Sequence, residues 1–166
     1  AEQRPSVPRR NESTADLCPS AIGQYIFGAL AHESHADLKA WYKKQRDYYF
    51  DMLQPVTDGM RRELPGVIMS SPDASIYSVI DVRNIAKPGF DANEFVMYCA
   101  SQGKVTVDGR DMTLLVSPMG GFYSVPAGQL NPGKTQMRIA YVESPERMMQ
   151  VPRLFSELFR QYEAKR

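Results

Sequence analysis

Large hydrophobic residues recur at every second position from 137 to 141 within residues 136–144, Gln-Met-Arg-Ile-Ala-Tyr-Val-Glu-Ser. A period of two predicts a β-strand with one buried face. That face carries Met137, Ile139 and Tyr141. Arg138 points the other way, between small or apolar neighbours, and two interpretations of it stay open. The guanidinium pairs with a neighbouring carboxylate at a sheet rim, or its planar, paired donors bind the carboxylate of a ligand.

A helical period runs from Ser34 to Glu63. Ser34 with Asp37 three residues later is typical of a capping box, and about 30 residues make a helix of roughly 45 Å, much longer than the average globular helix. Pro55 removes a backbone donor and predicts a bend. The apolar positions are Leu38, Trp41, Tyr42, Tyr49, Met52, Leu53, Val56 and Met60. A helix of this length reaches past a small domain, so we expect its first apolar residues to be under-buried and to face a partner domain.

Shorter patterns surround this helix. Cys18-Pro19-Ser20 predicts a helix start with Pro19 in the first turn, and the helix ends near His32. Its apolar face carries Ile22, Tyr25, Ile26, Ala29 and Leu30. The segment Leu64-Pro65-Gly66 ends the long helix, and the β-branched residues of 75–82 predict a strand. Asp91, with Glu94 three residues later, predicts a short helix that ends at Gly103.

The C-terminal part contains a hairpin and a closing helix. Residues 104–107 and 110–117 flank Asp108-Gly109, the pair that a type I′ turn prefers. After the Arg138 strand, Ser144 caps a helix that Pro145 begins and that Pro152 must kink or restart. Its apolar face carries Met148, Leu154, Phe155, Leu158, Phe159 and Tyr162.

The order of these elements predicts an α+β fold, a small, mainly antiparallel sheet covered by helices and entered by a long kinked helix. We divide the chain into a mobile lead-in (1–17), a boundary helix (18–33) and one domain (34–166). The chain has 166 residues and does not begin with Met, and we expect it to be a piece of a longer protein.

Composition argues against several classes of function. Twenty Lys and Arg against nineteen Asp and Glu leave a formal charge of +1, and no basic run interleaves with aromatics, so we expect neither nucleic acid nor membrane as a partner. Cys18 and Cys99 are isolated. His32 and His35 lack acidic or thiol neighbours. We therefore expect no metal site or disulfide and a reducing, cytoplasmic location.

Residues 128–135, Gly-Gln-Leu-Asn-Pro-Gly-Lys-Thr, match the phosphate-loop pattern G-x-x-x-x-G-K-[ST]. Val79-Ile80-Asp81 could pass for the acidic strand end that holds magnesium in such enzymes. A phosphate loop requires a helix after its Lys-Thr pair, whereas a strand follows here and Pro132 removes one amide of the cradle. We reject a nucleotide site and interpret Lys134 as a solvated turn residue.

Four segments together resemble a known family in order and spacing. They are Cys18–Gln24, Ala74–Val82, Val116-Ser117-Pro118 with Gly121-Phe122-Tyr123, and Met137–Tyr141. From about Cys18 onward, the chain resembles the C-terminal part of a class I/II aminotransferase of the aspartate aminotransferase kind, a pyridoxal-phosphate enzyme of fold type I. A hairpin at Val107–Thr113 departs from that pattern, because many relatives run directly into the Ser-Pro segment.

The resemblance implies a function and a missing part. In that family the Arg at the position of Arg138 clamps the substrate's α-carboxylate, and the partners are amino acids, 2-oxo acids and a second subunit. The Lys that forms a Schiff base with pyridoxal phosphate lies upstream, in a large domain. None of the seven Lys residues here has its sequence context. We therefore expect a small domain that is inactive alone. The alternative is a free-standing binding or structural module with the same fold.

Overall fold

The structure, a computed structural model, describes residues 20–71 and 75–166. The lead-in predicted for residues 1–17, and the residues Cys18 and Pro19, lie outside the described residues. The chain divides into two compact units, residues 1–45 and 46–166. Helix α3 (His35–Glu63) crosses the boundary between them.

The N-terminal unit is helical in its described part. It contains α2 (Ala21–Gly28), the 3-10 helix η1 (Ala29–His32) and the first turns of α3. The hydroxyl of Ser20 accepts a hydrogen bond from Gly23 N at 3.2 Å, so Ser20 is the N-cap of α2. The predicted end near His32 is confirmed. The apolar face of this helix is exposed, with Ile22 at 74% and Tyr25 at 85%.

Helix α3 begins and ends where the pattern predicted. The hydroxyl of Ser34 accepts a hydrogen bond from Asp37 N (3.1 Å) and donates one to the Asp37 carboxylate (2.6 Å). Pro55 lies inside the helix, and Gly66 adopts φ +92° in the turn that follows it, a conformation that glycine reaches without steric cost. Only the second half of α3 is buried, at Met52, Leu53, Val56, Thr57, Gly59 and Met60.

Four antiparallel strands form the main sheet, in the order β1-β2-β6-β5. They are β1 (Ile68–Met69), β2 (Tyr77–Asp81), β6 (Gln136–Ala140) and β5 (Ser117–Pro118). The α+β prediction is therefore confirmed. The strand predicted for 75–82 is shorter at both ends. Strand β1 was not predicted, because two residues carry no periodic pattern.

The predicted hairpin exists, but its second arm is shorter. Strands β3 (Val105–Val107) and β4 (Arg110–Met112) form a sheet of their own. Asp108 (φ +50°) and Gly109 (φ +75°) have the positive angles of a type I′ turn. The prediction that the arm continues to Ser117 is wrong. Ser117 belongs to β5 and pairs with Arg138 of β6 instead.

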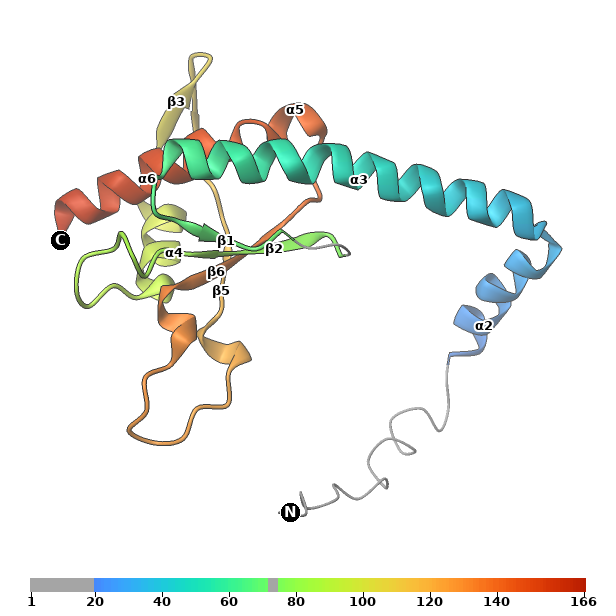
Figure 1. Cartoon of the computed structure of the whole chain (residues 1–166), viewed down its shortest axis with the longest axis horizontal. Coiled ribbons are helices and arrows are strands. Elements are labelled where there is room, and N and C mark those ends of the chain that lie inside the picture. Colours follow the sequence, from blue (N-terminus) through green and yellow to red (C-terminus); the bar gives the residue numbers. More distant parts are fainter. Residues whose placement is uncertain (1–19, 72–74) are drawn as a thin grey trace. The chain divides into compact units, whose positions relative to one another are not determined.

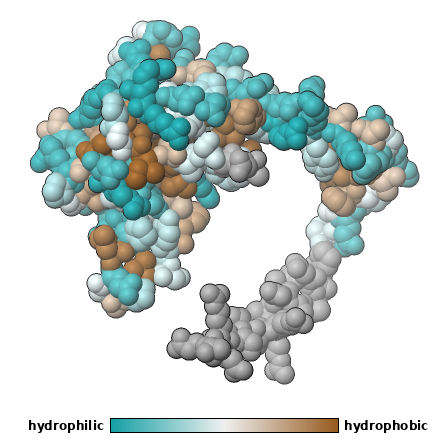
Figure 2. All heavy atoms as spheres, viewed as in Figure 1, coloured by the Kyte–Doolittle hydropathy of each residue, from teal (hydrophilic) through white to brown (hydrophobic). Residues whose placement is uncertain are grey.

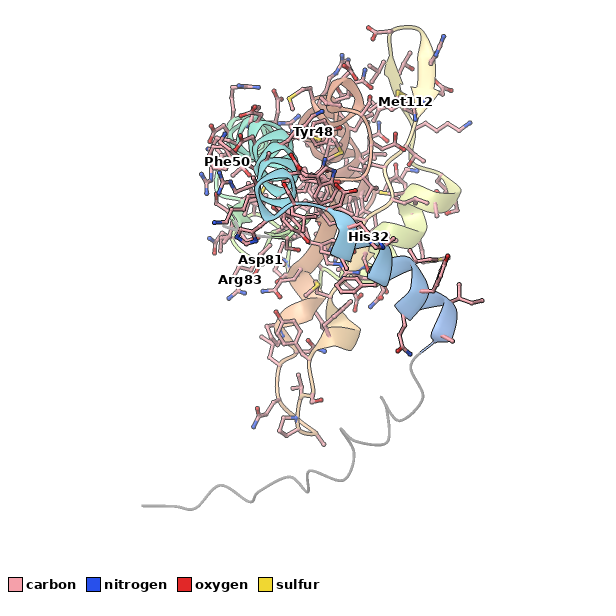
Figure 3. The ribbon with its side chains drawn as sticks, turned by 90° about the vertical axis from the view of Figure 1, so that its right-hand side faces the viewer. His32, Tyr48, Phe50, Asp81, Arg83 and Met112 are labelled. Atoms are coloured by element: carbon pink, nitrogen blue, oxygen red, sulfur yellow. The ribbon has the colours of Figure 1, made fainter. Side chains whose placement is uncertain are left out.

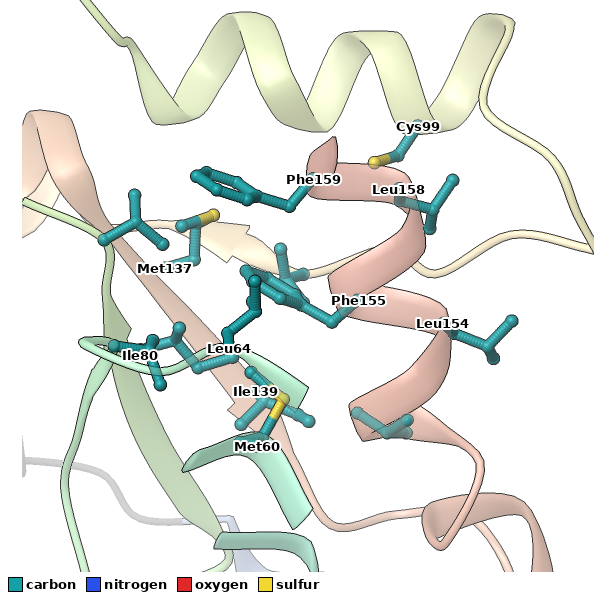
Figure 4. Packing of buried hydrophobic residues seen from close by; sticks show 14 of the residues in the cluster. Met60, Leu64, Ile80, Cys99, Met137, Ile139, Leu154, Phe155, Leu158 and Phe159 are labelled. Atoms are coloured by element: carbon teal, nitrogen blue, oxygen red, sulfur yellow. The ribbon is translucent and has the colours of Figure 1, made fainter. Parts of the chain in front are cut away.

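Helices cover one face of the sheet and enclose the core. They are the second half of α3, α4 (Ala92–Ser101), α5 (Pro145–Met148) and α6 (Val151–Lys165). The predicted apolar face of the closing helix is buried along its whole length, and Phe155 and Phe159 lie toward Met137 of the sheet (Figure 4). Pro152 stands in the first turn of α6. Of the two predicted outcomes, Pro152 therefore restarts the helix.

A long connection joins β5 to β6 and carries the 3-10 helices η2 (Gly120–Phe122) and η3 (Pro132–Thr135). Figure 1 shows it in orange, extending away from the helices. Hydrophobic side chains reach the surface over this loop (Figure 2), where Leu130 is 85% exposed. Within residues 20–71 and 75–166, no helix combines the length and apolar character that a membrane span requires.

Candidate functional site

The alternation along β6 gives the main sheet two different faces. Met137, Ile139 and Tyr141 are 0%, 4% and 0% exposed and pack under the helices, as predicted. Arg138 lies on the other face, which is open and where the residue opposite it in β2 is Val79. Because β6 is an inner strand, Arg138 lies in the middle of this open face and not at a sheet rim.

Two aromatic rings contact the guanidinium of Arg138. Its central carbon lies 4.5 Å from the centre of the Tyr77 ring and 4.8 Å from that of the Phe122 ring. Tyr77 comes from β2, the neighbour of β6 on one side. Phe122 follows β5, the neighbour on the other side. The cation is therefore contacted from both flanks of its own strand, which favours a fixed position.

The paired-carboxylate interpretation of Arg138 finds no support in the part of the chain that the structure describes. Among the described residues, no acidic side chain lies within ion-pair distance of the Arg138 guanidinium, and no acceptor forms a hydrogen bond with it. The in-plane N–H groups remain available to a ligand. Planar paired donors of this kind match the two oxygens of a carboxylate.

A buried carboxylate, Asp81, lies on the same face of the sheet but has other partners. Arg83 donates to it from its backbone N (2.9 Å) and its Nε (2.7 Å), and Thr135 Oγ1 and Gln136 Nε2 each donate at 2.9 Å. Figure 3 shows Asp81 and Arg83 side by side. Burial by itself would raise the pKa of Asp81, but the bonds from Arg83, Gln136 and Thr135 outweigh it, and the pKa lies below its usual value.

The Asp81 network continues toward the connection that carries Phe122. Tyr123 donates its hydroxyl hydrogen to Gln136 Oε1 at 2.5 Å. One side chain, Gln136, thus joins the end of β2 to the residue after Phe122. Sequence reasoning missed this network. Its one local signal was an acidic residue at the end of an apolar strand, which we considered only as a magnesium ligand.

The phosphate-loop match does not form a cradle. The backbone N–H of Gly133 donates to the side-chain Oδ1 of Asn131 at 2.8 Å, and the backbone N–H of Lys134 donates to the carbonyl oxygen of Asn131 at 3.1 Å. Neither amide is therefore free to bind a phosphate. The strand β6 follows η3 directly, as predicted. Lys134 is exposed, as predicted, but it lies in the 3-10 helix η3 and not in a turn.

Residues with other reactive side chains do not assemble a second site. Cys99 is buried, and burial raises the pKa of its thiol to about 12, which disfavours the reactive thiolate. Among the described residues, no group of three or more His, Cys, Asp or Glu side chains is placed to hold a metal ion.

The Lys residues do not fit a bound pyridoxal phosphate. A Schiff base requires a Lys held next to the aldehyde of the cofactor, with groups nearby that bind its phosphate and its pyridine nitrogen. All seven Lys residues are exposed. Lys87 donates to the carbonyl of Glu163, and Lys165 to the side chain of Gln102. The described residues therefore provide no Lys in a cofactor pocket beside Arg138.

A groove of about 480 Å³ lies within the N-terminal unit. It is lined by Leu30, Glu33, Asp37, Leu38, Trp41 and Tyr42. Trp41 and Tyr42 are 55% and 60% exposed, and their rings meet edge to face with centres 5.2 Å apart. The prediction that the first apolar residues of α3 are under-buried is thus confirmed for these two aromatic residues.

Solved structures of aminotransferases share this fold. The alpha-aminoadipate aminotransferase LysN of Thermus thermophilus, complexed with N-(5'-phosphopyridoxyl)-L-leucine, aligns over 95% of this chain with a TM-score of 0.67 and 16% identity. The chain has the fold of part of an aminotransferase. The Pyrococcus horikoshii kynurenine aminotransferase, solved with PMP, aligns over 92% of this chain with a TM-score of 0.65 and 14% identity. An archaeal alanine:glyoxylate aminotransferase aligns over 95% of this chain with a TM-score of 0.59 and 18% identity.

These likenesses involve only a part of each aminotransferase. The chain covers 35%, 33% and 34% of the three solved chains, about a third of their length. No protein-family model matches the sequence, and no curated protein matches it significantly. The fold class inferred from the sequence patterns and the aminotransferase resemblance are confirmed at the level of the fold.

Proposed function

We propose that this chain is the C-terminal, substrate-closing domain of a pyridoxal-phosphate-dependent aminotransferase, which transfers an amino group between an amino acid and a 2-oxo acid. Arg138 binds the substrate's α-carboxylate. The missing part of the enzyme is a large domain that holds the cofactor, and the complete enzyme is a homodimer. The aminotransferase fold over more than nine-tenths of the chain supports this proposal.

One observation carries the role of Arg138. Its guanidinium lies on the open face of the sheet, between two rings, with no carboxylate partner among the described residues. A structural arginine is expected to satisfy its N–H groups within the protein. An arginine that keeps them available while its position is held is suited to a ligand that brings its own carboxylate.

The exposed Lys residues indicate which part of the reaction this chain performs. Bound pyridoxal phosphate supplies the electron sink for amino transfer, and the exposed Lys residues of this chain do not provide its anchoring amine. The contribution of this chain is to bind and orient the substrate. A clamped carboxylate fixes one end of a small amino acid and so orients its amino group.

The decisive experiment is the substitution Arg138→Lys in the aminotransferase that contains this chain. Lysine keeps the positive charge but lacks the planar, paired N–H donors of the guanidinium. We expect amino-acid and 2-oxo-acid affinities to fall by one to a few orders of magnitude, with each tenfold worth about 1.4 kcal/mol, and cofactor affinity to stay nearly constant. The matched control is Arg153→Lys, at an exposed pair with Glu157 on α6. Unchanged substrate affinity would return Arg138 to a structural role.

The coding sequence upstream of Ala1 separates this proposal from the alternative of a free-standing module. We expect it to encode a large domain that contains a Schiff-base Lys. A start codon immediately before Ala1 would favour a binding or structural module that uses the same fold without a reaction.

A further inference from the structure

We infer that Tyr77 and Phe122 are positioning residues for Arg138, whose rings hold the guanidinium in place so that its N–H edge is presented to a carboxylate. The inference rests on the proposed function, because it concerns the residue that binds the substrate. Neither the aminotransferase likeness nor the sequence patterns assign a role to these two rings.

The topology explains why these two rings meet at Arg138. In the β2–β6 pairing, Val79 lies opposite Arg138 and Tyr77 opposite Ala140. Paired residues share a face, so the Tyr77 ring is a diagonal neighbour of Arg138, within reach of an aromatic side chain. Phe122 arrives from the other side, because η2 follows β5 and β5 pairs with β6 at Ser117 and Arg138.

The rings are not there to fill the core. Tyr77 is 39% exposed and Phe122 is 56% exposed, and neither belongs to the buried hydrophobic cluster. Two large aromatic side chains on an open face gain little from burial there. Their shared contact is the guanidinium, at 4.5 Å and 4.8 Å.

Contact with ring faces suits a guanidinium that must bind a carboxylate. An arginine cation is attracted to the electron-rich face of an aromatic ring, and it stacks there because it is weakly hydrated. Its hydrogen bonds are directed in its own plane, so ring contacts leave them available. A free Arg side chain loses rotamer entropy when it binds, and a side chain already held by two rings has less to lose.

The test is an NMR measurement on this chain with the substitutions Tyr77→Leu and Phe122→Leu. Leucine keeps an apolar side chain but removes the ring. Tyr77→Phe keeps the ring and serves as the rescue variant. Tyr48→Leu, at a 45% exposed tyrosine of α3, is the control for loss of an exposed ring. The observable is the order parameter of the Arg138 Nε–Hε group, together with its ring-current shift.

We expect an Arg138 order parameter close to that of rigid backbone, about 0.85, in the parent chain, in Tyr77→Phe and in Tyr48→Leu. It should fall below about 0.6 in Tyr77→Leu and in Phe122→Leu, with loss of the ring-current shift. Backbone spectra report whether each variant is folded. An Arg138 that is equally ordered without the rings, or disordered in their presence, would overturn the inference.

A kinetic measurement separates this inference from the proposed function. In the aminotransferase that contains the chain, each leucine variant should raise the substrate KM about three- to tenfold, with a smaller change in kcat and none in Tyr77→Phe. If Arg138→Lys raises KM and the leucine variants do not, the positioning role is wrong and the proposed function stands. If none of these substitutions changes KM, the carboxylate-binding function itself is refuted.

Discussion

The side-chain amide of Gln136 donates a hydrogen bond of 2.9 Å to the carboxylate of Asp81, the residue directly opposite it in the β2–β6 pair. Asp81 is 3% exposed and also accepts hydrogen bonds from Arg83 and Thr135. Hydrogen bonds from this many donors stabilise the charged form of a buried carboxylate, because a bond to an ionised acceptor is stronger than a bond to a neutral one.

We predict that Asp81→Asn makes the free energy of unfolding less dependent on pH in the acidic range. The pKa of Asp81 is lowered in the folded state, so its stabilising effect is present above its unfolded pKa, about 3.9, and is lost as the pH falls through the lower folded value. Removing the charge should cost about 2 kcal/mol at pH 7, with a smaller difference below pH 3. Urea unfolding of both proteins between pH 2 and 7 measures this. A pH-independent difference would contradict it.

A second prediction concerns Gly133, which is buried where the connection between β5 and β6 folds back on itself. A Cβ at this position would lie 2.5 Å from the carbonyl oxygen of Met119 and 2.7 Å from the nitrogen of Gly120. These are backbone atoms, which cannot turn aside. We expect Gly133→Ala to destabilise the chain by about 1–3 kcal/mol and to shift the resonances of Phe122.

The control for Gly133 is Gly121→Ala, because a Cβ at Gly121 meets no atom within 4 Å. It should leave the midpoint of thermal unfolding nearly unchanged. Equal stability of the two alanine variants would show that the close approach of η3 to residues 119–120 is not maintained.

The third prediction concerns Trp41, the only tryptophan of the chain. Trp41 is 55% exposed and lines the groove of the N-terminal unit. Because the Trp41 side chain is exposed, we expect red-shifted fluorescence that acrylamide quenches readily in a dilute monomer. Aromatic surface of this kind also favours association with a partner. Addition of the large domain that we propose should shift the emission to the blue. A blue-shifted, quencher-resistant emission from a strictly monomeric sample would contradict the assignment of this surface to a partner domain.

The fourth prediction is that the 166-residue chain has no aminotransferase activity alone. Its Lys residues are exposed, whereas a Schiff base requires a Lys held next to the aldehyde of the cofactor by groups that bind the rest of that molecule. A solvent-exposed ion pair contributes about 0–1 kcal/mol, so Arg138 should hold a carboxylate only weakly. Titration with pyridoxal phosphate, followed by absorbance above 400 nm, should show weak binding without saturation. A stoichiometric, pH-dependent band with turnover would refute the assignment of this chain as a domain without its own cofactor site.

Local patterns in the sequence predicted most of the elements because their causes are local. The Ser34–Asp37 cap, the Asp108-Gly109 turn and the two faces of β6 each depend on residues a few positions apart. The same periodicity placed Arg138 opposite the buried face of its strand, and the structure confirms that placement. Its role as a carboxylate ligand stays a prediction.

What the sequence by itself determined is therefore the fold class, both ends of helix α3 and the face on which Arg138 lies. Only the tertiary structure decided which residues surround it. Tyr77 and Phe122 are far from Arg138 in the sequence, and Thr135 and Gln136 are far from Asp81. These residues meet because β2 and β5 pair on opposite sides of β6. That pairing depends on long-range backbone hydrogen bonds and on burial of the opposite face under α6, and neither leaves a periodic signal within a short stretch of sequence.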